Sequence, residues 1–135
     1  MSVQHFNPKK LFNSKKYGFS QVVVSRASGR IFNTSGQVAL NAEEEIVGQD
    51  IESQTRQALS NLKIALEEID GSLTDVMMLR IYYVYKKNLD TARIGIVLRE
   101  FFGIENPPAS TWIGVASLAR PEFLIEMEAS GVISD

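Results

Sequence analysis

Two glutamates near the C-terminus are the residues best suited to chemistry in this chain. They lie in residues 124–129, where apolar and acidic side chains alternate. Side chains two positions apart on a strand share a face, so Glu126 and Glu128 point to one side while Ile125 and Met127 point to the other. A carboxylate pair on a strand with an apolar opposite face is either a solvated sheet surface or the acid–base equipment of a cleft.

A second strand pattern follows the Asn106-Pro107-Pro108 break. Its alternation sorts the side chains onto two faces: Ser110, Trp112 and Gly114 on one, and Thr111, Ile113 and Val115 on the other.

Composition narrows the chemistry further. With 135 residues, 44% of them hydrophobic, the chain predicts a single domain spanning residues 1–135. The absence of cysteine excludes disulfides, thiolate zinc sites and a cysteine nucleophile. The one histidine, His5, falls in a predicted loose N-terminal arm and reads as an unremarkable surface residue, which argues against Ser-His-Asp catalysis and multi-histidine metal sites. We expect no metal and no cofactor.

Charge and hydropathy indicate which partners to expect. The net charge is −2, and the sequence has no basic block for a phosphate backbone, so no nucleic-acid partner is expected. No apolar run approaches the length of a membrane span, and the N-terminus has no signal-peptide pattern. The sequence predicts a cytoplasmic protein whose partner is a small molecule.

Periodicity and turn signals predict an α+β fold in the order β-β-α-β-α-β-β. The first two strands flank a Gly-containing turn at residues 27–29 and are expected to form a hairpin. The first helix should stop at Asp70-Gly71 and the second at Gly103. The predicted elements are strands at 21–25 and 30–34, a helix at 51–69, a strand at 76–85, a helix at 89–102, and strands at 110–115 and 124–129.

Two helices can cover only one face of such a sheet. In the long strand, the residues expected under the helices are Met77, Leu79, Ile81, Tyr83 and Tyr85. The opposite face would carry Val76, Met78, Arg80, Tyr82 and Val84, and a face this apolar needs cover. Self-association, in which another copy of the chain covers this face, is the simplest way to remove it from water. It would place Arg80, Tyr82, Trp112, Glu126 and Glu128 near a subunit boundary.

Several short motifs, taken in order, resemble the Rid family, also called YjgF or reactive intermediate deaminase proteins. The motifs are Thr34-Ser35-Gly36-Gln37, the run from Gln54 to Leu62, Phe101-Phe102, Pro108-Ala109, and Ile125-Glu126-Met127-Glu128-Ala129. The resemblance implies a chorismate-mutase-like fold with two helices on one face of a mixed sheet. It also implies a homotrimer with clefts between subunits.

Well-studied family members hydrolyse enamines and imines such as 2-aminoacrylate to 2-keto acids and ammonia. The resemblance assigns the water-positioning glutamate to Glu128, the cleft turn to Ser35 and Gly36, and the place of a cleft-closing tyrosine to Phe19, with Tyr17 as a possible substitute. Glu126 is expected to be structural, either pairing with a cation of a neighbouring subunit or facing solvent.

The chain departs from the family where the substrate carboxylate is bound. Ser110 occupies the arginine position, which should weaken carboxylate binding by about tenfold or more. Trp112 replaces a frequent cysteine and would fill part of the cleft. Arg80 is the candidate replacement cation, although a salt bridge with Glu126 is an equal alternative, and Arg120 is expected to face solvent. The predicted site comprises Glu128 as the catalytic residue and Phe19, Ser35, Gly36, Arg80, Ser110, Thr111 and Trp112 as substrate-binding residues.

Three functions remain open. The first is hydrolysis of a small imine or enamine other than a simple amino-acid derivative, and the retained glutamate favours it. The second is a non-catalytic trimer that binds a small hydrophobic or aromatic metabolite through Trp112, Phe19 and Tyr82. The third, RNA cleavage or translation inhibition, is disfavoured by the acidic net charge and the lack of a basic–aromatic patch.

Overall fold

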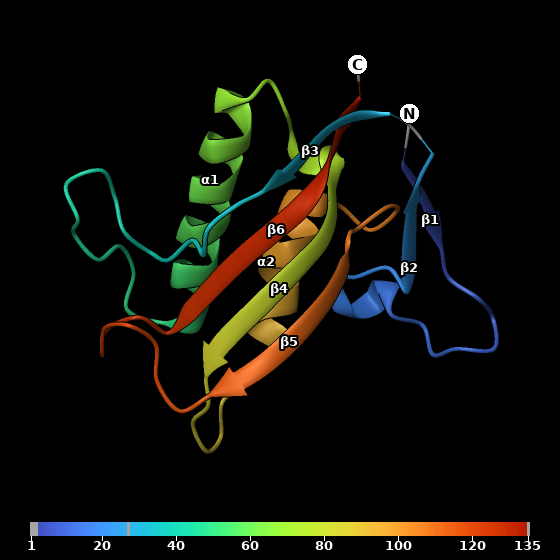
Figure 1. The fold of residues 1–135 in the computed structure, drawn as a ribbon. Coiled ribbons are helices and arrows are strands. Elements are labelled where there is room, and N and C mark those ends of the chain that lie inside the picture. Colours follow the sequence, from blue (N-terminus) through green and yellow to red (C-terminus); the bar gives the residue numbers. More distant parts are fainter. Residues whose placement is uncertain (1–2, 27, 135) are drawn as a thin grey trace.

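The main sheet carries helices on one face only (Figure 1). The computed structural model describes residues 3–26 and 28–134. Within them the elements are β1 Val3–Phe6, η1 Lys15–Tyr17, β2 Val22–Ser25, β3 Gly29–Asn33, α1 Ile51–Glu68, η2 Leu73–Asp75, β4 Val76–Val84, α2 Ala92–Phe102, β5 Ala109–Val115 and β6 Ile125–Ser134. No helix in this part of the chain is long and apolar enough to cross a bilayer.

The main sheet has the strand order β3-β6-β4-β5. β6 is antiparallel to both of its neighbours, whereas β4 and β5 are parallel. A parallel pair needs a crossover connection, and α2 supplies it. The central strand β6 therefore carries its two glutamates between β3 and β4.

The core lies between the sheet and the two helices. Its fully buried members come from every layer: Leu59, Leu62 and Leu66 of α1, Ile94 and Val97 of α2, Leu79 and Ile81 of β4, and Ile125 and Met127 of β6. The predicted α+β class and the helix-covered face of β4 are confirmed at Leu79 and Ile81.

Local chemistry fixes both ends of α1. Asp50 accepts a hydrogen bond from the Ser53 amide at 2.7 Å and closes a capping box at the N-terminus. At the other end Asp70 adopts φ 60°, and the Gly71 amide donates to the Leu66 carbonyl at 2.8 Å. The predicted stop at Asp70-Gly71 is therefore confirmed.

The predicted hairpin of the first two strands is wrong. β2 pairs with β1, and β3 pairs with β6 in the main sheet, so the two strands belong to different sheets. The turn pattern at 27–29 includes Ala27, which lies outside the described residues. The β1–β2 pair involves the N-terminal segment, and the β3–β6 pair joins segments far apart in sequence. A local turn signal could therefore reveal neither pairing.

Two elements differ from the sequence prediction at one end by more than one residue, and one side chain lies on the other face. β6 runs to Ser134 because burial continues to alternate through Ala129, Gly131 and Ile133. α2 begins at Ala92 rather than Leu89, after Asp90 accepts a hydrogen bond from the Ala92 amide at 3.0 Å. A register shift between Val76 and Met78 turns Val76 into the core at 1% exposure, not onto the open face as predicted.

Candidate functional site

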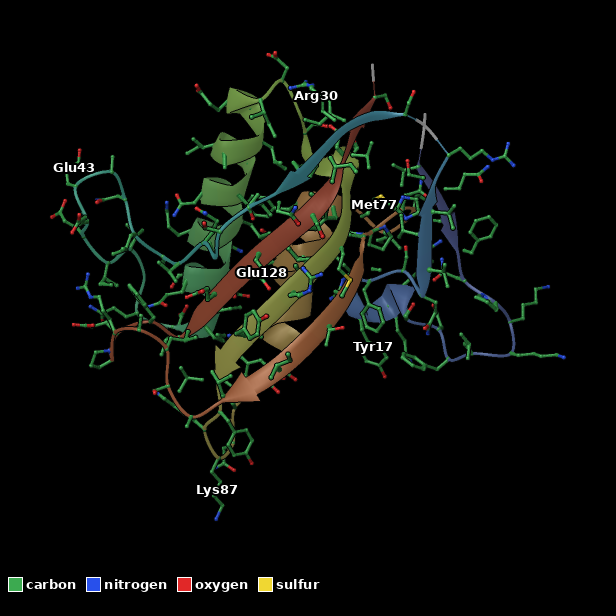
Figure 2. All side chains as sticks on the ribbon, viewed as in Figure 1. Tyr17, Arg30, Glu43, Met77, Lys87 and Glu128 are labelled. Atoms are coloured by element: carbon green, nitrogen blue, oxygen red, sulfur yellow. The ribbon has the colours of Figure 1, made fainter. Side chains whose placement is uncertain are left out.

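The two glutamates of β6 lie on the sheet face away from the helices. Figure 2 shows Glu128 near the middle of that face. In the antiparallel register Glu128 is opposite Arg80, and Glu126 is opposite Tyr82. All four side chains are partly exposed, so they form an accessible polar patch on an otherwise apolar strand pair.

Glu128 is held by its neighbours on β4. The Tyr82 hydroxyl donates to Glu128 Oε1 at 2.9 Å, and Arg80 Nη1 lies 4.0 Å from the same oxygen. This hydrogen bond raises the pKa of Tyr82, because losing the proton would leave two negative oxygens in contact. Arg80 therefore approaches Glu128 rather than Glu126, its predicted salt-bridge alternative, and its placement near the glutamates agrees with the sequence prediction.

Glu126 has different surroundings. It makes no hydrogen bond or ion pair with any described residue, and its carboxyl group packs against the backbone of Gly36. A Cβ atom on Gly36 would lie 2.6 Å from Glu126 Cδ and 2.7 Å from Cγ, closer than real contacts allow. A side chain at position 36 would therefore force this carboxylate to move away from the turn.

An extra residue in the chain after β3 creates this contact. The Thr34 amide donates to the Ala129 carbonyl at 2.8 Å, and Gln37 and Met127 exchange two backbone hydrogen bonds at 2.7 and 3.0 Å. Between these two pairs, Ser35 and Gly36 lie opposite the single residue Glu128. One extra residue on one strand is a bulge-like arrangement, which reorients side chains. Ser35 and Gly36 form this bulge, so the predicted cleft turn lies beside the glutamates.

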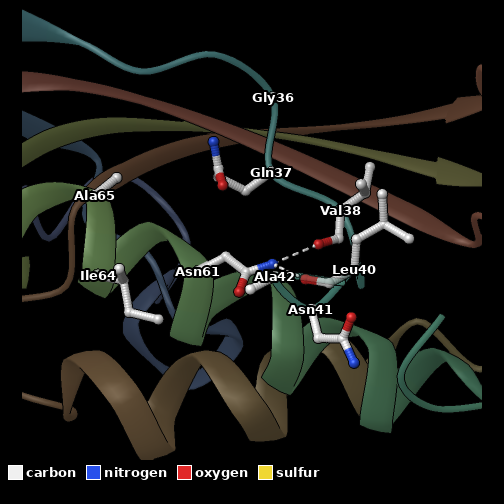
Figure 3. Close-up of a pocket in the computed structure, with 9 residues that line it drawn as sticks. All are labelled: Gly36, Gln37, Val38, Leu40, Asn41, Ala42, Asn61, Ile64 and Ala65. Carbon is white, nitrogen blue, oxygen red and sulfur yellow. Dashed lines mark hydrogen bonds between the residues drawn. The ribbon is translucent and has the colours of Figure 1, made fainter. Parts of the chain in front are cut away.

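Asn61 of α1 holds the segment that follows the bulge. Its Nδ2 donates to the carbonyls of Val38 and Leu40, both at 2.8 Å (Figure 3). Its Oδ1 accepts from Gln57 Nε2 at 2.9 Å. A cavity of about 440 Å³ lies between this segment and α1. Sequence reasoning placed Asn61 in a family-like motif but gave it no role. The signal available in the sequence was an amide side chain, that of Asn61, on the face of the predicted helix that packs toward the sheet.

Trp112 and Ser110 lie on the other face, contrary to the predicted place of Trp112 at the open-face boundary. The parallel register sets Trp112 beside Ile81 and Thr111 beside Arg80. Trp112 therefore packs against the core on the helix side, where its Nε1 donates to Ser110 Oγ at 3.0 Å. Only Thr111 of this predicted trio shares the glutamate face.

Phe19 accompanies Trp112. Their ring centroids are 6.4 Å apart, and Phe12 makes edge contacts with both Phe19 and Tyr17 at 6.1 and 6.2 Å. Tyr17, on η1, and Glu128 are well separated in Figure 2. Within one chain the predicted site thus divides into a glutamate group on the open face and an aromatic group on the helix side.

Two further sequence predictions have different outcomes. Arg120 lies in an exposed turn, 3.5 Å from Glu122 and over the ring of Phe123, as expected. His5, predicted as a surface residue of a loose arm, belongs to β1. Its Nδ1 is 2.9 Å from the Pro107 carbonyl and 3.1 Å from Ser20 Oγ, and burial lowers the pKa of the ring. It fastens the N-terminal strand to the segment before β5.

Comparison with known proteins gives consistent results. Residues 13–133 match the profile of the family described as Endoribonuclease L-PSP. A RutC family protein of Pyrococcus abyssi is 40% identical over 103 residues, covering 75% of this chain and 77% of the relative. The 2-iminobutanoate/2-iminopropanoate deaminase of Escherichia coli is 32% identical over 107 residues, covering 77% and 80%.

Solved structures agree with this assignment. A Rid family protein of unknown function from Yersinia pestis, YyfB, has a TM-score of 0.92 and 39% identity, covering 98% of this chain and 100% of its own. A putative endoribonuclease of Thermotoga maritima has a TM-score of 0.71 and 32% identity, covering 86% and 87%. The predicted fold of two helices on a mixed sheet is therefore confirmed, and the chain belongs to the Rid/YjgF family.

Proposed function

We propose that this protein hydrolyses a small imine, or an enamine that first tautomerises to the imine, to a carbonyl compound and ammonia. The observation that carries the proposal is the Glu126 carboxylate, which packs on the Gly36 turn without a partner among the described residues. The names of deaminase relatives support the same reaction class.

The reaction places simple demands on the site. Water adds to the carbon of the C=N bond and gives up a proton, the nitrogen gains protons, and the resulting carbinolamine expels ammonia as the carbonyl forms. A carboxylate within reach of the water can accept its proton and later return one to the leaving nitrogen. Glu126 suits this role because no described residue forms a hydrogen bond or ion pair with its oxygens, whereas Glu128 already accepts from Tyr82 and lies near Arg80.

This assignment revises the prediction from the sequence, which gave the role to Glu128. The two residues share a face, so strand parity alone could not choose between them. The contact with the Gly36 turn favours Glu126, and the hydrogen bond from Tyr82 favours a supporting role for Glu128. We retain Ser35, Thr111 and Arg80 as proposed surroundings of the glutamates.

Assembly would bring the remaining predicted residues into the same site. We infer self-association, because the open face exposes Ile31 at 79% and Ile113 at 41% with no helix to cover them among the described elements. The number of subunits, three, is what the family resemblance implies. In such an assembly the aromatic group of one subunit can complete the glutamate group of its neighbour. Light scattering coupled to size exclusion should give three times 15.0 kDa, and a stable monomer at micromolar concentration would refute the shared site.

The catalytic proposal is tested by two matched substitutions. Ammonia and carbonyl product are measured from a panel of enzymatically generated imines, with and without a carboxylate. We expect Glu126→Gln to lower kcat by about 10²–10⁴. Glu128→Gln should cost much less, and the mass of the assembly should not change in either variant.

The outcomes separate the alternatives. A large loss with Glu128→Gln and none with Glu126→Gln would restore the assignment from the sequence. Absence of turnover across the whole panel would overturn the hydrolase and leave the ligand-binding alternative.

A further inference from the structure

A second cavity lies on the helix side, between η1 and α2. Its volume is about 470 Å³, enough for a small ring system. The residues that matter for its chemistry are Lys16, Tyr17, Asp90, Gly95, Arg99 and Trp112. None of them belongs to the glutamate group, although Tyr17 and Trp112 belong to the aromatic group, so binding in this cavity is tested here without measuring the proposed hydrolysis.

Trp112 supplies a flat wall fixed in one orientation. Its only polar atom is satisfied by the bond from Nε1 to Ser110 Oγ at 3.0 Å, and its ring packs against Phe19. An indole held in this way offers an apolar face to a planar ligand, and aromatic pairs favour such offset contact.

Gly95 keeps the floor of the cavity open. It is buried, and a Cβ there would lie 3.1 Å from the Tyr17 carbonyl, 3.3 Å from Arg99 Nη1 and 3.7 Å from Trp112 Cη2. A side chain at this position would therefore occupy the space beside the indole. The same distances place the Arg99 guanidinium and the Trp112 ring close to one point in the cavity.

The charged groups around the cavity favour an anion. Arg99 Nη1 donates to the Lys16 carbonyl at 2.7 Å, which orients the guanidinium and leaves other N–H groups available. The Lys16 ammonium lies 5.0 Å from the centre of the Tyr17 ring. The cavity has one carboxylate beside these two cations, that of Asp90, and its Oδ1 already accepts a hydrogen bond from the Ala92 amide at 3.0 Å.

We propose that this cavity binds a planar aromatic carboxylate, with its ring against Trp112 and its carboxylate on Arg99. Planar, bidentate pairing with a carboxylate is the geometry that a guanidinium provides best. Ser110 and Arg80 are not among the lining residues of this cavity, and Arg80 lies on the opposite face of the sheet, so neither is assigned to it. This binding does not depend on catalysis, so the proposal applies whether the protein is a hydrolase or a non-catalytic binding protein.

Trp112 provides a direct readout because it is the only tryptophan in the chain. Its indole N–H gives one side-chain signal in a ¹H–¹⁵N NMR spectrum of the intact assembly. We expect 1-naphthoate to shift that signal saturably. The neutral isostere 1-naphthamide and the ring-free anion acetate should bind at least about tenfold more weakly, since each lacks one half of the interaction.

Arg99→Gln should weaken naphthoate binding by about tenfold or more. The matched control is Arg30→Gln, because Arg30 also donates from a partly exposed guanidinium to a backbone carbonyl, that of Ile69 at 2.9 Å, but outside the cavity. This control should bind like the unaltered protein.

Three results would overturn the proposal: no saturable shift with naphthoate, equal affinity for naphthoate and naphthamide, or a folded Arg99→Gln variant with unchanged affinity. The comparison of naphthoate with naphthamide uses the unaltered chain and decides the question even if the variant fails to fold. Because imine turnover is not measured, failure here leaves the proposed hydrolysis to its own test.

Discussion

Replacing Gly36 by alanine should separate the activity of this protein from its stability. The new Cβ would lie 2.6 Å from the carboxyl carbon of Glu126, whereas ordinary contact begins at 3.4 Å. The carboxyl group must therefore move by about 0.8 Å, and its nearer oxygen by more. A misplacement near 1 Å costs roughly 10² in rate, so a loss of that size is expected on any imine that is turned over.

Stability should respond much less to the same change. The colliding atoms belong to the far end of a flexible side chain, which can rotate into solvent, so we expect the free energy of unfolding to change by less than about 1 kcal/mol. The measurements are ammonia release and urea denaturation of the same preparations.

Gly114→Ala is the matched control. Its Cβ would lie 3.4 Å from the Tyr83 ring, an ordinary contact, and both rate and stability should be retained. Unchanged activity in Gly36→Ala would refute the view that Glu126 acts from its position over this turn.

Three other predictions concern stability. Gly131→Ala should destabilise the fold by about 3 kcal/mol or more in urea denaturation, because its Cβ would collide with the Asp75 carbonyl and lie 2.7 Å from the Phe32 ring; a loss below about 1 kcal/mol would contradict the packing. Asn61→Ala should cost about 1–3 kcal/mol, since two partly buried carbonyls lose their donor, and Asn61→Asp should restore little of it. Burial lowers the pKa of His5 below its usual 6.5, so the folded state favours the neutral ring. Stability should be full above pH 6.5 and fall as the pH drops below it, and the same titration of His5→Gln should lack this step.

Sequence patterns were sufficient for the two α-helices, for the strands of the main sheet and for the face that β6 buries. Alternation predicted that Glu126 and Glu128 share one face of a strand, the 3.6-residue period predicted α1, and the Asp70-Gly71 turn signal predicted where this helix stops. These features depend on residues within a few positions of one another, which is the range over which backbone geometry and side-chain direction are set.

Which strands pair, and which face of the sheet a β5 side chain occupies, could be learned only from the tertiary structure. Whether β2 pairs with β1 or β3 depends on contacts between segments distant in sequence, which no turn signal encodes. The face of Trp112 relative to Arg80 depends on the register of β5 against β4, and a shift of one residue would reverse it.

The difference between the two glutamates has the same origin. Both are acidic residues on one strand face, and their sequence context is nearly identical. Only the bulge after β3 places Gly36 against Glu126, and only the length of Tyr82 brings its hydroxyl to Glu128. The sequence by itself determined which side chains point outward together. The tertiary structure decided their individual partners, because those partners come from other strands whose register is set by the packing of the whole sheet.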